Sequence, residues 1–187
     1  MLMVSMTKIE KVTTYFMEPG SENTDDVVDA VARRFEEGDI KTVVVASTSG
    51  RTGVKFAEAL RGKAEVIAVS HERMQAEFKE RIAKLGGTAV DETHLPLHER
   101  GMDDVRRAFY TLGQGFKVAI EVILIASDRG LVEPYRDVIA IGGTGRGSDT
   151  AIIARSTNSK DIFSGSSYRK LEIREVLAMP LEKKWWV

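Results

Sequence analysis

The most constraining feature of this sequence is a set of short apolar runs with almost no polar position. Residues 42–46 read Thr-Val-Val-Val-Ala, and residues 65–69 and 137–141 form similar runs of β-branched and apolar side chains. Strands that are apolar on both faces must be covered on both faces, as in a parallel sheet between two layers of helices. The pattern therefore predicts an α/β fold in which strands and helices alternate along the chain.

The segments between these runs have the spacing of amphipathic helices. In residues 24–37, Val27, Val31 and Phe35 recur at i, i+4 and i+8, so they form one buried stripe. Gly38 suits the end of this helix, because glycine readily takes the left-handed conformation of a helix stop. Helical spacing is also found in residues 54–60, 74–85, 103–112 and 116–129, and residues 88–90 are predicted as a short strand.

The C-terminal part of the chain has a different order of elements. Residues 150–154 and 172–178 are rich in β-branched side chains and have no helical segment between them. The sheet is therefore expected to be mixed at one edge and parallel at its centre. A chain of 187 residues without a linker, a repeat or a low-complexity segment suits a single domain, residues 1–187.

Composition excludes several classes of function. The formal net charge of −1 does not supply the basic face that general nucleic-acid binding requires. The absence of cysteine excludes disulfides, thiol catalysis and thiolate metal sites. Residues 1–6 are too short for a signal peptide, and Glu121 interrupts the longest apolar stretch, residues 118–126, so we expect a cytoplasmic protein without membrane contact. Few Asn and Gln among many Glu, Lys and Arg hint at a thermophilic source.

One loop between a predicted strand and a predicted helix is rich in hydroxyl groups and glycine. Ligands of parallel sheets bind beyond the carboxyl ends of the strands, and this loop leaves such an end. Its glycines would let N–H groups at a helix N-terminus approach an anion, and its arginine could form two parallel hydrogen bonds. An ordinary capped turn explains one or two of the hydroxyl groups, so we predict that the loop holds a phosphate. Its residues are Ser47, Thr48, Ser49, Gly50, Arg51, Thr52 and Gly53.

A second glycine-rich loop follows another buried strand. It lacks the lysine of a P-loop and the glycine spacing of a dinucleotide fingerprint, and the segment after it has the character of a strand. Four glycines would allow a close approach to a flat ligand or a sugar, whereas a simple hairpin connection explains them equally well. The candidate binding residues here are Gly142, Gly143, Thr144, Gly145, Arg146, Gly147 and Asp149.

A third loop, residues 18–24, leads into the first predicted helix. Asn23 or Thr24 can cap the free N–H groups, and Asp25 and Asp26 suit the positive end of the helix dipole. Capping accounts for these residues, so a ligand contact is the less favoured interpretation.

The histidines and one glutamate are further candidates. His71 comes directly after a predicted strand, so it is expected near the site, although it could simply flank a helix start. His94 and His98 have a spacing suited to a metal on a helix, but Pro96 between them prevents that geometry, so no metal site is predicted. Glu121 needs a partner inside its apolar helix, so it is either paired structurally, the favoured interpretation, or turned toward a cleft.

Several stretches of the chain resemble the C-terminal α/β domain of pyruvate kinase. Residues 43–52 and 65–70 are similar to the strand, phosphate loop, helix and second strand that build its allosteric sugar-phosphate site. Over nearly its whole length, the chain resembles a stand-alone archaeal family of pyruvate kinase α/β-domain-like proteins. The stretches that carry this closer resemblance are residues 15–24, 47–53, 118–128 and 141–151.

The resemblance implies a three-layer α/β/α sandwich around a five-stranded, mostly parallel mixed sheet with one antiparallel edge strand. It implies no kinase activity, because the catalytic barrel of pyruvate kinase is absent, and it associates the chain with bound flavin mononucleotide (FMN). By position, residues 47–53 would hold the phosphate, and residues 142–149 would approach the ribityl chain or the ring.

We therefore expect a domain that binds a phosphate-bearing small molecule, FMN above all, for regulatory or carrier use. One alternative is a flavin-dependent oxidoreductase in which His71 or Glu121 handles protons. Another is a sensor of a sugar phosphate or nucleotide that acts through a homo-oligomer. Trp185 and Trp186 are candidate interface residues for such an oligomer.

Overall fold

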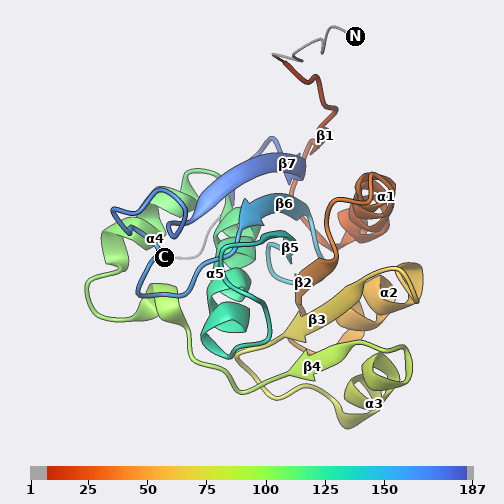
Figure 1. The fold of residues 1–187 in the computed structure, drawn as a ribbon. Helices are drawn as coiled ribbons and strands as arrows, with labels where there is room; N and C mark the ends of the chain where they lie inside the picture. Colours follow the sequence, from red (N-terminus) through yellow and green to blue (C-terminus); the bar gives the residue numbers. More distant parts are fainter. Residues whose placement is uncertain (1–7, 185–187) are drawn as a thin grey trace, which may run out of the picture.

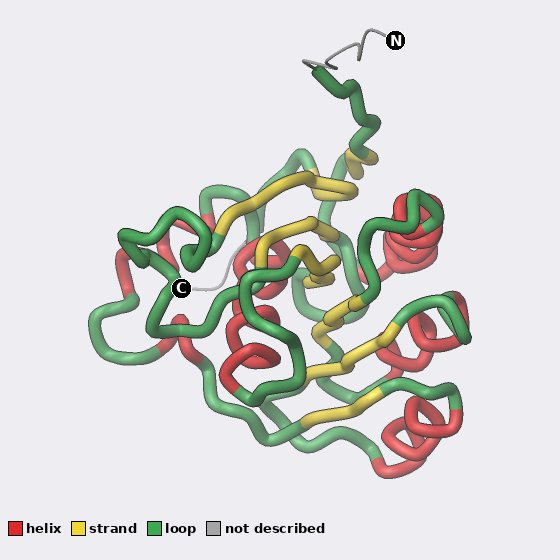
Figure 2. The backbone as a smooth tube through the Cα atoms, viewed as in Figure 1, coloured by secondary structure: helices red, strands yellow, loops and turns green. Residues whose placement is uncertain are grey.

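The computed structural model describes residues 8–184. Within them, seven strands form one sheet in the order β1-β7-β6-β5-β2-β3-β4, with helices on both faces (Figure 1, Figure 2). The predictions for residues 1–6, Trp185 and Trp186 lie outside the described residues. The strands are β1 (Thr14–Phe16), β2 (Thr42–Ala46), β3 (Glu65–Val69), β4 (Thr88–Val90), β5 (Asp137–Gly142), β6 (Thr150–Arg155) and β7 (Glu172–Pro180). The α-helices are α1 (Thr24–Phe35), α2 (Arg51–Ala59), α3 (Ala76–Lys84), α4 (Asp103–Tyr110) and α5 (Gln114–Asp128), and the short 3₁₀ helices are η1 (Ser21–Asn23) and η2 (Pro96–His98).

Six of the seven strands run in the same direction, and β6 runs against them. β6 pairs with β5 on one side and with β7 on the other, so the antiparallel strand lies inside the sheet. The prediction of five strands with an antiparallel edge strand is therefore wrong, because the edges are β1 and β4. β1 has only three residues and its central Tyr15 is exposed, so it is too short to produce a recognisable alternation in the sequence.

The sheet buries a different apolar cluster on each face, which confirms the predicted α/β class. Val43 and Val45 of β2 pack on the side of α1, α2 and α3, whereas Val44 between them packs against α5 on the other side. Figure 1 shows the first three helices together on one side of the sheet, with α4 outside α5 on the other. α5 is 15 residues long and mostly buried. No helix within residues 8–184 combines the length and apolar character that a membrane crossing requires.

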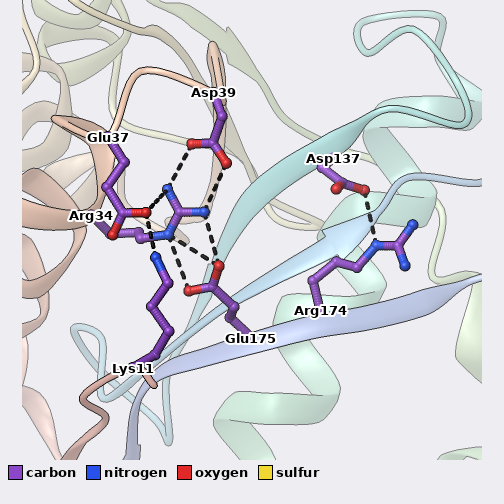
Figure 3. Close-up of polar contacts among 7 residues, drawn as sticks. All are labelled: Lys11, Arg34, Glu37, Asp39, Asp137, Arg174 and Glu175. Atoms are coloured by element: carbon purple, nitrogen blue, oxygen red, sulfur yellow. Dashed lines mark hydrogen bonds and ion pairs between the residues drawn. The ribbon is translucent and has the colours of Figure 1, made fainter. Parts of the chain in front are cut away.

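A buried arginine joins α1 to the sheet at the amino ends of the strands (Figure 3). Arg34 is 8% exposed and forms paired hydrogen bonds to Asp39, at 2.7 and 2.9 Å, and to Glu175 of β7, at 2.9 and 3.0 Å. Glu37 accepts from Lys11 and lies 3.4 Å from Arg34, which extends the cluster. Hydrogen bonds to Asp39 and then to Glu175 raise the pKa of Arg34 above its usual value. Every charge in this cluster is matched by one from another part of the chain.

Candidate functional site

An open cleft of about 1740 Å³ lies at the carboxyl ends of the central strands. The ends of β2 and β3, both loops predicted from the sequence and one face of α5 line it. This is the edge at which ligands of parallel sheets bind. Ten of the sequence-predicted site residues line the cleft: Ser47, Thr48, Ser49, Arg51, Thr52, His71, Gly143, Gly145, Arg146 and Gly147.

The loop after β2 is shaped by hydrogen bonds to its own hydroxyl groups. Ser47 Oγ accepts from Gly53 N–H at 2.9 Å, and Ser49 Oγ accepts from Arg51 N–H at 3.3 Å. Ser47 N–H donates to the carbonyl oxygen of Val69, which ties the loop to β3. α2 therefore begins at Arg51, three residues before the predicted start at residue 54, and its N-terminus faces the cleft. Because the N–H groups of Gly50, Arg51 and Gly53 are bonded inside the turn, the donors that remain for an anion are mainly the hydroxyl groups and the Arg51 guanidinium.

The two glycines of this loop have packing roles. Gly50 has a φ of +97°, and a Cβ there would lie 2.6 Å from Phe78 Cβ of α3. A Cβ on Gly53 would lie 2.6 Å from Ala68 Cβ of β3, so Gly53 lets α2 pack closely on the sheet. Neither glycine lines the cleft. The close approach that these residues allow is to neighbouring side chains, and they contribute to the site by fixing the start of α2.

The loop between β5 and β6 is a hairpin held at three of its four glycines. A Cβ on Gly142 would lie 2.0 Å from the Gly115 oxygen of α5, and one on Gly143 would lie 2.3 Å from the Gly147 oxygen. Gly147 has a φ of +69° and lies against Ser21 and Thr24. Gly145, with a φ of +83°, has nothing near the position of its Cβ and faces the cleft. The hairpin interpretation thus accounts for most of the glycines, and the exposed tip carries Gly145 and Arg146 into the cleft wall.

Asp149 is fully buried, and its carboxylate holds this hairpin in place through hydrogen bonds. Its carboxylate accepts from Thr144 N–H at 3.0 Å and from Thr150 Oγ1 at 2.8 Å, and it also receives the N–H of Gly20. Burial raises the pKa of Asp149 above its usual value, against these hydrogen bonds. Asp149, Thr144 and Gly142 do not line the cleft, so their part in the site is to hold the loop.

The loop before α1 is attached to the same hairpin. Thr24 Oγ1 accepts from Ser148 N–H at 3.0 Å and donates to the Ser21 oxygen at 2.6 Å. Neither Asn23 nor Thr24 caps α1 with its side chain, so the capping prediction is wrong. Asn23 donates to the Glu18 oxygen instead, and Thr24 is buried between the two loops. Ser21 and Thr24 both line the cleft, although the sequence favoured a purely structural role for them.

The cleft is strongly cationic in a chain whose net charge is −1. Seven Lys and Arg side chains line it and only two carboxylates do. Such an excess of one sign attracts ligands of the opposite sign. The basic residues are Arg51, Lys55, Arg73, Arg106, Arg107, Lys117 and Arg146, and the acidic ones are Glu72 and Glu121.

Two of these cations differ from the others in their surroundings. Lys55 pairs with Asp25 and Arg106 with Asp103, whereas neither Arg51 nor Arg146 has a carboxylate within 4.0 Å among residues 8–184. The Arg51 guanidinium lies over the Phe78 ring, 5.7 Å from its centre, which holds the side chain beside α3. The two unpaired charges come from the two predicted loops and lie in the wall of one cleft.

The opposite wall carries a buried polar cluster that the sequence prediction missed. Nζ of Lys117, on α5, lies 2.5 Å from Oε2 of Glu121 and 2.8 Å from Nε2 of His98. Glu121 Oε1 also accepts from Leu97 N–H at 3.2 Å. Glu121 is thus both paired and in the cleft wall, and its engaged oxygens disfavour it as a free proton acceptor. A second charge at i−4 in the same apolar helix was the sequence signal that could have located the cluster.

The three histidines have separate partners. His71 lines the cleft, and its Nε2 lies 3.5 Å from Glu72 Oε1. Nε2 of His94 lies 3.1 Å from Oδ2 of Asp128, at the end of α5. His98 binds Lys117. Across residues 8–184 no three His, Asp or Glu side chains are grouped as a metal site would require.

Residues 25–154 match the family of pyruvate kinase alpha/beta domains, and this stretch includes both loops of the cleft. The chain belongs to this family. Among solved structures, it is similar to a pyruvate kinase from Cryptosporidium parvum, with 15% identity and a TM-score of 0.43. The similarity covers 71% of this chain and 22% of that enzyme, so the matched part spans about a fifth of the enzyme's length. The predicted resemblance to the pyruvate kinase α/β domain is confirmed, and an archaeal source stays a prediction.

Proposed function

We propose that the cleft binds a phosphate-bearing small molecule, and that FMN is the ligand. The observation that carries this proposal is the pair of unpaired guanidinium groups, Arg51 and Arg146, in the lining of one cleft. An arginine without an internal carboxylate is suited to a ligand anion, because guanidinium and phosphate form paired, charge-assisted hydrogen bonds.

The phosphate would lie at the N-terminus of α2. There the positive end of the helix dipole would favour the anion, and Thr48, Ser49 and Thr52, which all line the cleft, would donate from their hydroxyl groups. Arg51 and Arg146 would complete the shell from two sides. The hydroxyl oxygen of Ser47 already accepts a hydrogen bond from Gly53 N–H, so Ser47 would act by stabilising the turn.

The remainder of the cleft suits a flat, partly apolar group. Val118, Val122 and Ile125 lie at i, i+4 and i+7 on α5 and form an apolar floor beside the strand ends. A volume of about 1740 Å³ exceeds that of an ordinary small-molecule pocket, so the cleft has room for a phosphate, a sugar-like chain and a ring system. Phosphate donors at one end and an apolar floor at the other fit the two halves of FMN, whose bound ring would supply redox chemistry.

Two measurements test the proposal. Freshly purified protein is expected to show flavin absorption, and FMN-free protein is expected to gain thermal stability when FMN is added. In isothermal titration calorimetry, the double variant Arg51→Ala/Ser49→Ala should bind FMN at least tenfold more weakly than the native chain. A colourless protein that FMN does not stabilise would refute the flavin assignment, and unchanged FMN affinity in the variant would refute the loop assignment.

A regulatory use through assembly is a second candidate, supported by the edge of the sheet at β1. Val12, Met17 and Leu181 are large exposed apolar side chains near this edge strand. Edge strands with exposed apolar residues favour association between chains. Light scattering with and without FMN tests this candidate, and an unchanged monomeric mass in both states would exclude it.

A further inference from the structure

The cleft face of α5 combines a polar line with an apolar line. Gln114, Lys117 and Glu121 lie at i, i+3 and i+7, next to Val118 and Val122. All five residues line the cleft. A ring that lies on the two valines would therefore have one edge beside the polar side chains.

Lys117 determines which nitrogen of His98 is free. The side chain of Lys117 is nearly enclosed, with 4% exposure, and its ammonium lies against Glu121, His98 and the Tyr110 ring. An ammonium group can donate but not accept, so His98 Nε2 must be the acceptor of the 2.8 Å bond. A neutral His98 then carries its proton on Nδ1.

The surroundings of His98 favour the neutral ring. Burial lowers the pKa of His98 first, and the positive charge of Lys117 lowers it further. Arg106 of α4 and His71 act in the same direction, and Glu121 opposes them. The His98 side chain is 40% exposed and lines the cleft, so its Nδ1–H remains for a partner outside the chain.

Gln114 supplies a complementary group one turn away from Lys117. Its side-chain oxygen is buried and has no hydrogen-bond partner among residues 8–184. A buried acceptor without a donor is unfavourable, so a ligand N–H at this position would be favoured.

We propose that this wall binds the edge of a heterocycle that carries a carbonyl oxygen beside an N–H group, as in a lactam or an imide. His98 Nδ1–H donates to the carbonyl oxygen, and Gln114 Oε1 accepts from the N–H. The inference rests on the proposed function in one respect: the same ligand has its phosphate at the loop of residues 47–53. The ring of a flavin is one member of this chemical class.

The first test uses the ligand-free protein. Long-range ¹⁵N–¹H correlation spectra distinguish the two neutral tautomers of histidine, and the three histidines can be assigned with His71→Gln and His94→Gln variants. His98 is expected to carry its proton on Nδ1 at neutral pH. A proton on Nε2 would overturn the proposal, whatever the outcome of phosphate-binding experiments.

The second test uses riboflavin, which has the ring without the phosphate. His98→Phe and Gln114→Leu should each weaken riboflavin binding by about tenfold and leave the binding of inorganic phosphate unchanged. Arg51→Ala should leave riboflavin binding unchanged, so a failure of the phosphate loop and a failure of this wall give different results. Riboflavin binding that neither His98→Phe nor Gln114→Leu weakens would overturn the proposal.

Discussion

Arg34 and the pair Arg51 and Arg146 use the same functional group in two different ways. Arg34 lies at the amino ends of the strands, where Asp39 and Glu175 saturate its guanidinium (Figure 3). Arg51 and Arg146 lie at the carboxyl ends, in a cleft, and have no carboxylate partner among the described residues. An arginine satisfied inside the chain joins elements together, whereas an arginine left unsatisfied in a cleft is suited to an external anion. The comparison predicts that stability and ligand affinity depend on different arginines.

The largest expected effect is on stability, from Arg34. In Arg34→Met the carboxylates of Asp39 and Glu175 lose their shared partner, and the free energy of unfolding should fall by about 3 kcal/mol. Both acids keep some access to water, which places the loss at the lower end for broken buried pairs. Urea denaturation measures the loss, and FMN affinity at a temperature where the variant is folded should stay unchanged.

Arg174→Met is the matched control. Arg174 of β7 pairs with Asp137 at 3.4 Å, as drawn in Figure 3, and with Glu172 at 3.1 Å. All three side chains are more than a third exposed, and such surface pairs contribute less than about 1 kcal/mol each. Equal losses in the two variants would contradict the special role given to Arg34.

The second effect is on ligand affinity, with stability almost unchanged. Arg51→Ala and Arg146→Ala should each weaken FMN binding by about tenfold or more, because each removes a charge-assisted hydrogen bond to the phosphate. Each should change the free energy of unfolding by less than about 1 kcal/mol, because Arg51 loses only an exposed cation–π contact and Arg146 has no carboxylate partner among residues 8–184. Arg61→Ala, at an exposed position outside the cleft, is the control for both measurements. A variant that loses stability and keeps its affinity would remove Arg51 or Arg146 from the site.

A smaller effect concerns the hairpin that carries Arg146. In Gly147→Ala the new Cβ would lie 2.4 Å from Thr24 Oγ1 at a left-handed φ, so stability should fall by about 2 kcal/mol and FMN binding should weaken. Gly145→Ala meets open space and should lose only about 1 kcal/mol, from its left-handed φ. Thermal unfolding of the two variants compares them, and identical losses would mean that the contact with Thr24 does not hold the hairpin.

The smallest effect is a pH dependence of the Arg34 cluster. The hydrogen bonds that Asp39 accepts from Arg34 hold the pKa of Asp39 below its usual value of 3.8. A lowered pKa in the folded state means that the stabilisation is complete above the usual value and is lost as the pH falls through the folded value. Between pH 5 and pH 2, Asp39→Asn should therefore lose less stability than the native chain in urea denaturation. Parallel curves would show that Asp39 does not contribute to acid unfolding.

The sequence was sufficient for most elements of the fold because their patterns are periodic. α1 shows its stripe of Val27, Val31 and Phe35, and β2 is apolar throughout, as strands covered on both faces are. β1 was not predicted because three residues are too few to show an alternation of apolar and polar positions. The place of β6 inside the sheet was not predicted because it depends on the pairing of β6 with β7. Such long-range pairing leaves no local signal.

The site was predicted less completely than the fold, for a related reason. Arg51 and Arg146 belong to loops that composition marks clearly, and the topology brings these loops to one cleft. The contact between Lys117 and His98 joins α5 to η2, and although each residue can be noticed in its own segment, nothing in the sequence indicates that the two meet. The glycines show the opposite case: Gly53 and Gly142 are conspicuous in the sequence, but their close neighbours are Ala68 and Gly115, which only the folded chain reveals.

The most direct test of phosphate binding at Arg51 and Arg146 is the ratio of the dissociation constants of riboflavin and FMN. Calorimetry on the native chain should give FMN the tighter binding by about 100-fold, because only FMN carries the phosphate. In the double variant Arg51→Ala/Arg146→Ala, the ratio should fall by at least about tenfold while riboflavin affinity stays constant, because only the hydroxyl groups and the helix N-terminus remain for the phosphate. A ratio that is the same in both proteins would contradict the assignment of the phosphate to these two arginines.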